Sequence, residues 1–568
     1  MFLLLAWIAI GRTSQIPIVD GWAVLNRLMR LQGGEVDWRT YLLTPHGAHL
    51  HSIIYALTYI DFYIADGTQQ FTLVCSLVAS AALCLIVIAW LLGEFGGILT
   101  TMQLILVALG VGAIVGNLAD SECMMVPFQA VLTVSRIAYV LLLYAIAWSC
   151  LHCRRMHFHL FLLAATVAAT FHGTGVLFAI CICLIPWLSR KSWSWYIAAL
   201  VPLGACICVT KLYSPGPGEL AEAAMLRFEA VPDLVLGFAA YFAVPFAPLR
   251  PLVGTSVLLA LGGSIGILLS VVTVRLILRF RIDAAGRAMD LEHESGQCRH
   301  VVDATVGVFG VLLILSACSA SLMWCARFKL LHIPGHAYEP MLELRTNRYI
   351  AYAGLAQLVL LSRIIGGVRD WSPVIQRRVI ASVWVLSLGL SLVVSAFALR
   401  VNTRDDDLAK AAAALSVGIS PIAADAEAVW PGAKDDWYWV NALPKTVDFM
   451  KERRKSIWSR LPRMADQLGS YPSRIPLADL SRVDVDAGGG GTRVRIAATI
   501  SCWGADMRGA AQVLPVVDRE GVVVGYACVT RRQGDPSRRS VVGFCTSGLA
   551  VGTELFLAPS ISNGVVFN

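Results

Sequence analysis

Long apolar runs make up most of the first 400 residues of the chain. They lie at residues 1–10, 71–92, 98–116, 127–150, 158–171, 174–188, 195–212, 252–278, 303–324, 348–365 and 379–399. A helix of about 20 apolar residues is long enough to cross a bilayer. The pattern therefore predicts a mainly α-helical, polytopic membrane domain over residues 1–400, with about eleven spans.

The apolar pattern ends near Arg400. Residues 401–487 contain charged helical stretches such as DDDLAKAAAAL and are predicted to be a mixed region outside the membrane. Four glycines, Gly488–Gly491, predict a flexible joint or a turn. Over residues 488–568, alternating and β-branched residues predict a small antiparallel β domain, which we expect to be a sandwich.

A polar stretch at residues 12–70 separates the first two apolar runs and is rich in histidine and acidic residues. We predict that it is the first external loop of the membrane domain. Within it, Asp20 precedes an amphipathic segment from about Gly21 to Leu31, where aspartate is a preferred helix N-cap.

Composition supports a membrane protein. The 568 residues are 57% hydrophobic and only 15% charged, with a mean hydropathy of +0.67. Soluble domains contain roughly 25% charged residues, so an ordinary soluble protein is excluded. In a membrane protein, the net charge of +8 is informative through its distribution over the loops. The sequence has no basic patch interleaved with aromatic residues, which argues against nucleic-acid binding.

Basic residues near the ends of the predicted spans indicate the orientation, because cytoplasmic loops are enriched in Lys and Arg. With a cytoplasmic N-terminus, the loops predicted inside contain Arg154, Arg155, Arg190, Lys191, Arg279, Arg281, Arg287, Arg299, Arg369, Arg377 and Arg378. The loops predicted outside are then 12–70, 117–126, 213–251, 325–347 and everything past residue 400. The odd number of spans places the C-terminal β domain outside the membrane.

This topology brings ionisable residues to one face of the membrane. The predicted external loops hold Asp20, His46, His49, His51, Asp61, Asp120, Glu122, Arg345 and Arg348. A carboxylate at the membrane surface can act as a general base on a hydroxyl acceptor. Arginine binds phosphate oxygens in a bidentate manner. Together they suit the transfer of a sugar from a lipid-linked phosphate.

Each candidate also has a structural interpretation. Asp20 can simply cap its helix, and the buried Asp61 can pair with His or Arg. Glu122 can be solvated, and Arg345 and Arg348 can anchor a span at the interface. The H-x-x-H-x-H spacing of the loop histidines suits either a divalent metal or ordinary hydrogen bonding, so we assign no metal ligand and leave a metal cofactor open.

The first loop resembles that of the GT-C type membrane glycosyltransferases. The segments VDGWAVLNRLMRL and LLTPHGAHLHSIIYALTYID keep an acidic residue with Trp22, then His46 and His49, then Asp61. They depart from the family at Ala48, where an acid is common, and at Leu50, where arginine is common. The resemblance covers about residues 1–400; the segments around Glu122 and at TNRY (Thr346–Tyr349) share it.

The resemblance implies a bacterial inner-membrane enzyme that uses a polyprenyl-phosphate sugar donor and a cell-surface glycan or lipid acceptor. It implies Asp20 as the base, with Asp61 and Glu122 as further catalytic candidates. The substrate-binding candidates are Trp22, His46, His49, Arg345, Arg348 and Tyr349. The C-terminal β domain is similar to appendages of some such enzymes, where it is either a glycan-docking module or a lid.

Two other functions are compatible with the sequence. A transporter or flippase for lipid-linked glycans needs no base, but predicts mid-span charges, of which Arg136 is the clearest, and an internal repeat. A polysaccharide polymerase or ligase predicts a long external loop late in the chain. In the β domain, two of Cys502, Cys528 and Cys545 can form a disulfide outside the cell, and the sequence does not choose the pair.

Overall fold

The computed structural model describes most of the helices and strands of the chain. The described residues are 20–45, 50–95, 100–115, 130–152, 157–171, 175–188, 192–213, 228–287, 310, 314, 317, 318, 321, 325, 350–367, 371–401, 405–417, 442–459, 461, 466, 475–486, 492–501, 511–529, 538–546, 553–558 and 565–567.

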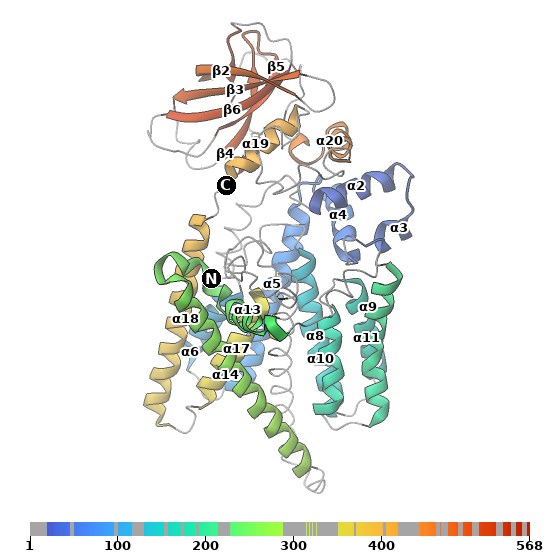
Figure 1. Ribbon diagram of the computed structural model, residues 1–568, viewed down its shortest axis with the longest axis vertical. Coiled ribbons are helices and arrows are strands. Elements are labelled where there is room, and N and C mark those ends of the chain that lie inside the picture. The colour runs from blue at the N-terminus through green and yellow to red at the C-terminus, as the bar shows by residue number, and fades with distance from the viewer. Residues whose placement is uncertain are drawn as a thin grey trace.

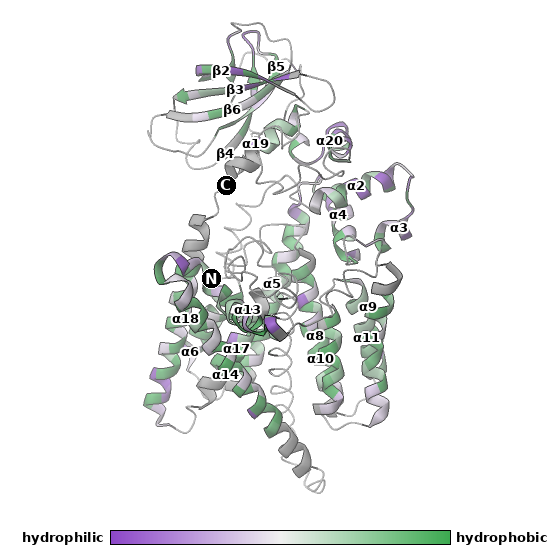
Figure 2. Cartoon of the chain, in the orientation of Figure 1, coloured by the Kyte–Doolittle hydropathy of each residue, from purple (hydrophilic) through white to green (hydrophobic). Residues whose placement is uncertain are grey.

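A bundle of apolar helices forms one part of the molecule, and a more polar cap lies at one end of the bundle (Figures 1 and 2). The bundle contains α5 (Gln70–Phe95), α6 (Thr101–Val115), α8 (Ala130–His152), α9 (His157–Thr170), α10 (Gly175–Leu188), α11 (Trp193–Tyr213), η3 (Phe228–Ala230), α13 (Val231–Ala243), η4 (Val244–Leu249), α14 (Arg250–Arg287), α17 (Ile350–Gly367) and α18 (Pro373–Val401). The cap contains α2 (Asp20–Gln32), α3 (Trp38–Leu43), α4 (Ser52–Ile64), α19 (Asp405–Ser416), α20 (Leu443–Glu452), η9 (Ser456–Ser459) and the β-strands.

Helices occupy each predicted apolar run from 71–92 to 252–278, and also 348–365 and 379–399. Among the described residues, four segments are long and apolar enough to cross a membrane: Gln70–Leu92, Leu132–Ser149, Val231–Leu278 and Pro373–Val394. The other apolar helices are shorter. The predicted number of about eleven spans therefore stays a prediction. Run 1–10 and most of run 303–324 lie outside the described residues.

The segment predicted as the external loop 213–251 contains more regular structure than expected. Helix α13 packs against α14, and η4 contacts α14, α17 and α18. Pro245 and Pro248 in η4 lack the N–H that a continuing helix needs, so the chain breaks between α13 and α14. Gln357 of α17 donates a hydrogen bond of 3.3 Å to the carbonyl of Phe242, near the end of α13.

The C-terminal strands form one antiparallel sheet, curved as a half-barrel. They are β1 (Ile475–Pro476), β2 (Ala478–Asp486), β3 (Thr492–Ser501), β4 (Ala511–Val517), β5 (Val523–Val529), β6 (Arg538–Thr546), β7 (Phe556–Leu557) and β8 (Val565–Phe567). Their order is β1-β7-β4-β5-β6-β3-β2, with β8 also paired to β4. The expected two-sheet sandwich is thus replaced by a single curved sheet.

Period-two alternation gives this sheet two apolar faces. On one face, Ile496, Leu514 and Ala527 belong to a core of the sheet's own. On the other face, Tyr526 and Phe544 are buried in the same cluster as the alanine-rich α19. Helix α19 packs on β4, β5 and β6. The sequence DDDLAKAAAAL is therefore an integral part of the β domain and not a linker, because its small side chains allow close approach to the sheet.

The structure differs from the predicted β domain in two details. The sheet begins before the glycine run, since β2 pairs with β3 up to Asp486 opposite Thr492. The glycines Gly488–Gly491 therefore connect two paired strands and do not mark the start of the domain. In the pairing of β5 with β6, Cys528 lies opposite Val542 and Cys545 opposite Gly525, and the two thiols are buried in different clusters, so they do not form a disulfide with each other. Cys502 lies outside the described residues.

A close helix contact in the bundle is directly testable. A Cβ atom placed on Gly110 of α6 would lie 2.3 Å from the buried ring of Trp384 in α18. We expect Gly110→Ala to destabilise the protein by about 1–3 kcal/mol through overpacking. The thermal midpoint of the purified protein in detergent measures this. Gly389→Ala in α18 is the matched control, because nothing lies within 4 Å of its added Cβ. A helical glycine replaced by alanine without a clash gains roughly 0.5–1 kcal/mol, and equal midpoints for the two variants would contradict the contact.

Candidate functional site

The described part of the chain contains three of the site residues predicted from sequence. Asp20 is the first residue of α2, and Trp22 is fully buried two positions later. Asp61 lies near the end of α4 and is 2% exposed. The other predicted residues are outside the described part, so their roles stay predictions: His46, His49, Glu122, Arg345, Arg348 and Tyr349.

Helix α2 is amphipathic and depends on its neighbours. Trp22, Leu25 and Leu28 are buried at three-residue spacing, while Arg30 is exposed. At 13 residues, such a helix is marginal in water by itself. Packing against α3, α4 and α20 therefore determines where α2, and with it the backbone of Asp20, lies in the cap.

Helices α3 and α4 pack side by side to complete the first loop. The carboxylate of Asp37 accepts a 2.7 Å hydrogen bond from the backbone N–H of Thr40 and caps α3. The hydroxyl of Tyr41 donates a 2.7 Å bond to the carbonyl of Tyr55 in α4. Burial raises the pKa of Tyr41, so its hydroxyl stays protonated as this donor.

Arg27 connects α2 to the segment that leads to the loop histidines. Its guanidinium donates hydrogen bonds to the carbonyls of Thr44 and Pro45. It also lies over the ring of Tyr55, 4.4 Å from the centroid. The chain is thereby held against α2 at the residue directly before His46. The sequence contained no signal for this role, because the acceptors are backbone carbonyls distant in sequence.

Asp61 has a defined structural task. Its carboxylate accepts hydrogen bonds from the backbone N–H groups of Gln69 at 2.8 Å, Phe71 at 2.8 Å and Thr72 at 3.3 Å. These groups are at the start of α5, where helix N–H groups have no intrahelical acceptor. Burial outweighs these bonds and raises the pKa of Asp61 to about 6. A carboxyl group with that pKa can exchange protons near neutral pH, so a catalytic role for Asp61 stays open beside its capping role.

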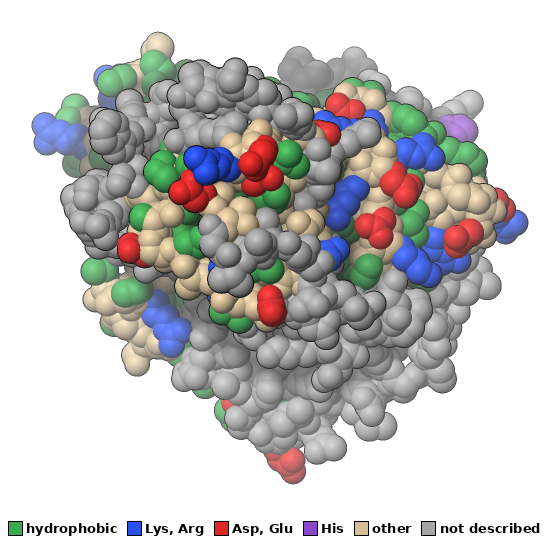
Figure 3. All heavy atoms as spheres, turned by 90° about the horizontal axis from the view of Figure 1, so that it is seen from above, with side chains coloured by type: hydrophobic (Ala, Val, Ile, Leu, Met, Phe, Trp, Pro, Cys, Tyr) green, Lys and Arg blue, Asp and Glu red, His purple; other side chains and the backbone are tan. Residues whose placement is uncertain are grey.

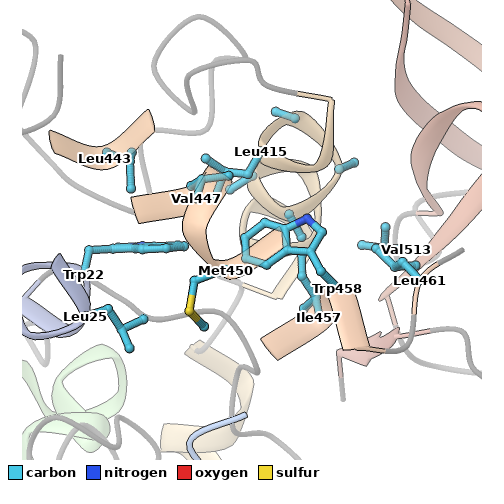
Figure 4. Close-up of a cluster of buried hydrophobic side chains, with 14 of the residues drawn as sticks. Trp22, Leu25, Leu415, Leu443, Val447, Met450, Ile457, Trp458, Leu461 and Val513 are labelled. Atoms are coloured by element: carbon cyan, nitrogen blue, oxygen red, sulfur yellow. The ribbon is translucent and has the colours of Figure 1, made fainter. Parts of the chain in front are cut away.

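The first loop shares a hydrophobic core with the C-terminal region. Figure 4 shows Trp22 and Leu25 of α2 beside Val447 and Met450 of α20. Trp458 of η9 belongs to the same cluster, which continues through α19 to the sheet. Segments more than 400 residues apart in sequence therefore form one folded unit at this end of the bundle (Figure 1).

Polar contacts join the same two regions. Asn26 of α2 donates a 3.0 Å hydrogen bond to the hydroxyl of Thr446 in α20. The turn after α4 is held by Lys455, whose ammonium is 2.8 Å from a carboxylate oxygen of Asp66. The backbone N–H of Ser456 also donates to the carbonyl of Asp66 at 2.6 Å. These contacts fix the register of the loop against the C-terminal region.

The outer surface of the cap carries both signs of charge. Viewed from above, basic and acidic side chains alternate over its described part (Figure 3). Arg30 and Glu35, for example, form an exposed ion pair at 3.1 Å. Among the residues that the structure describes, no three His, Cys, Asp or Glu side chains are grouped to hold a metal ion.

Comparison with known proteins gives no further identification. No family model matches the chain, and neither a curated protein nor a solved structure is similar to it. The interpretation of the cap therefore depends on its own residues.

The raised pKa of Asp61 predicts a pH-dependent contribution to stability. The folded protein binds the Asp61 proton more tightly than the unfolded chain, so this group adds stability as the pH falls from about 6 towards 4. The free energy of unfolding of the wild type, minus that of Asp61→Asn, should therefore rise by up to about 3 kcal/mol between pH 7 and pH 4. Denaturant or thermal unfolding of both proteins across this range measures the difference.

Asp37→Asn is the control for this measurement. Hydrogen bonds from Thr40 hold the pKa of the exposed Asp37 below its usual value, so its contribution is lost as the pH falls. The two differences should therefore change in opposite directions with pH. A pH-independent difference for Asp61→Asn would show that the buried carboxyl does not titrate in this range.

Proposed function

We propose that the protein is a membrane glycosyltransferase of the GT-C kind. It moves a sugar from a polyprenyl-phosphate-linked donor to a cell-surface glycan or lipid acceptor at the external face of a bacterial inner membrane. Asp20 is the base that takes the proton from the acceptor hydroxyl. Arg345 and Arg348 bind the donor phosphate, with His46 or His49 assisting.

The position of Asp20 carries this proposal. It begins an amphipathic helix whose apolar face is buried in the cap, and the cap lies at the end of an apolar bundle (Figure 2). The first residue of α2 lies at the positive end of the helix dipole, where a negative charge is favoured. A base in a polar cap at the end of an apolar bundle would have access to both a lipid-linked donor and a polar acceptor.

Asp61 is the second carboxyl group of this proposal. It lies in the same cap, and its pKa of about 6 suits a proton acceptor at neutral pH. Its oxygens already accept bonds from the start of α5, so a proton taken up there would also alter the junction between the loop and the bundle. Glu122 and Tyr349 keep the roles expected from the resemblance, whereas Trp22 is fully buried in the core of the cap and supports the site through packing.

One observation favours a transporter for lipid-linked glycans as the second candidate. Arg136 is 3% exposed and lies within the candidate span Leu132–Ser149. Thr133, one turn away on the same helix, is also buried. Charged residues inside membrane helices often line the path of a transported substrate. A transporter needs no catalytic base, so replacement of Asp20 separates the two functions.

Replacement of the proposed base gives the test of function. In cells that lack the gene, we expect wild-type protein to restore one sugar unit of a surface glycan and Asp20→Asn to fail. A general base contributes about 10²–10⁴-fold to a rate, so the variant should leave a small fraction of the product. Mass analysis of the surface glycans measures the sugar, and immunoblotting confirms equal protein levels.

Glu35→Gln is the matched control, since Glu35 is an exposed acid of the same loop, paired with Arg30. It should restore the glycan like the wild type. Full glycosylation with Asp20→Asn would overturn the assignment of the base. Accumulation of a complete lipid-linked glycan on the inner face in the deletion strain would instead support the transporter.

A further inference from the structure

We infer that the C-terminal segment Leu443–Leu461 is a positioning element for α2, and that through α2 it sets the place of Asp20. This inference concerns the same site as the proposed function and rests on it for its catalytic part. It assigns to residues of the C-terminal region a role other than the docking module or lid that the resemblance implies.

Helix α2 and this segment bury apolar side chains in one cluster. Met450 and Ile457 are fully buried, and Trp458 nearly so, in the cluster that contains Trp22 and Leu25 (Figure 4). Burial of large apolar side chains stabilises the folded state. Because α2 is marginal alone, this contact helps to determine whether and where the helix forms.

A hydrogen bond between Asn26 and Thr446 also joins α2 to α20. Thr446 is fully buried, and its hydroxyl also donates to the carbonyl of Ala442 at 2.9 Å. Its position is thus fixed by its own helix before it accepts the bond from Asn26 at 3.0 Å. A directional, partly buried bond of this kind fixes the rotation and the axial position of α2, which apolar packing leaves less defined.

The two turns that meet at this junction have strained backbone. Asp66 and Gln69 in the turn after α4 have φ angles of 52° and 65°. Arg454 and Ser456 in the opposing turn have φ angles of 56° and 57°. Left-handed backbone is unfavourable for residues other than glycine, and it persists only where the surroundings hold it. The bond from the N–H of Ser456 to the carbonyl of Asp66 joins these two strained turns.

Side chains of the two turns and of α20 are closely packed at this junction. A Cβ atom on Gly67, whose φ is 66°, would lie 3.1 Å from Cε of Met450. The ring of Phe62 stacks on Phe449 of α20 with centroids 5.5 Å apart. The apolar contact, the polar contact and the strained turns therefore hold both α2 and the α4–α5 turn against one segment. A shift of Leu443–Leu461 has to move α2 with it.

A single hydroxyl provides the test. Thr446→Val keeps the volume of the side chain and removes the acceptor for Asn26, whereas Thr446→Ser keeps the hydroxyl. Thr499→Val is the control, because this threonine hydroxyl also makes one side-chain hydrogen bond, from β3 to Asp479 of β2 in the sheet. Two measurements are made on each protein: amide hydrogen exchange of residues 23–32 in lipid nanodiscs, and surface sugar per unit of protein in the complemented deletion strain.

The inference predicts that amides of α2 exchange about tenfold faster in Thr446→Val, as expected when a partly buried hydrogen bond is lost. Thr446→Ser and Thr499→Val should exchange like the wild type. Sugar transfer should fall in Thr446→Val and be rescued in Thr446→Ser. Unchanged exchange in Thr446→Val would overturn the inference. So would faster exchange with wild-type transfer, because α2 would then move without consequence for Asp20.

Failure of the proposed function is recognised separately. If deletion of the gene leaves every surface glycan unchanged, the transferase is wrong whatever α2 does. The exchange of α2 in Thr446→Val then still decides whether the C-terminal segment positions this helix.

Discussion

The apolar packing of α2 against α20 is the contact on which the arrangement of the cap depends. It places Trp22 and Met450 in one buried cluster and joins the first loop to a segment more than 400 residues later in the chain. Helix α2 has 13 residues and α20 has 10, and isolated helices of these lengths are marginal in water. Each helix therefore depends on burying its apolar face against its neighbours, which for α2 are α3, α4 and α20.

The same cluster reaches the membrane bundle and the sheet. Leu132, near the start of α8, belongs to it, and so do the alanines of α19 and Phe544 of β6. The cap is thus one continuous core rather than a loop and a separate appended domain. A change in the sheet can reach α2 through packed side chains, because close-packed interiors transmit displacements.

The sequence predicts the helices of the bundle well, because each needs only a long apolar run. It also predicts the helix that starts at Asp20 and the strand-rich end of the chain, since helix caps and period-two alternation are local signals. The pairing of α2 with α20 has no local signal. The segment VDFMKERRKSIWSRL has the charges of a solvated helix, and only the fold shows that Met450, Ile457 and Trp458 turn inward together.

Other differences have equally physical causes. The glycine run predicts either a flexible joint or a turn, because glycine is common in both, and the pairing of β2 with β3 up to its edge favours the turn. The sandwich became one curved sheet because α19 covers the face that a second sheet would have covered. For the site, the acid at the start of α2 could be proposed from sequence. The contacts that Arg27 and Thr446 make around α2 could not be proposed from sequence, because their partners are distant in the chain.

The central claim is that the first loop and the C-terminal segment pack together on one side of the membrane. A zero-length carbodiimide cross-link tests it most directly, since the carboxylate of Asp66 is 2.8 Å from the ammonium of Lys455 and its side chain is 61% exposed. In intact membranes treated from the external side, mass spectrometry should find an amide bond between these two residues, and Asp66→Asn should abolish it. Modification of Asp66 by the reagent without any bond to Lys455 would contradict the account.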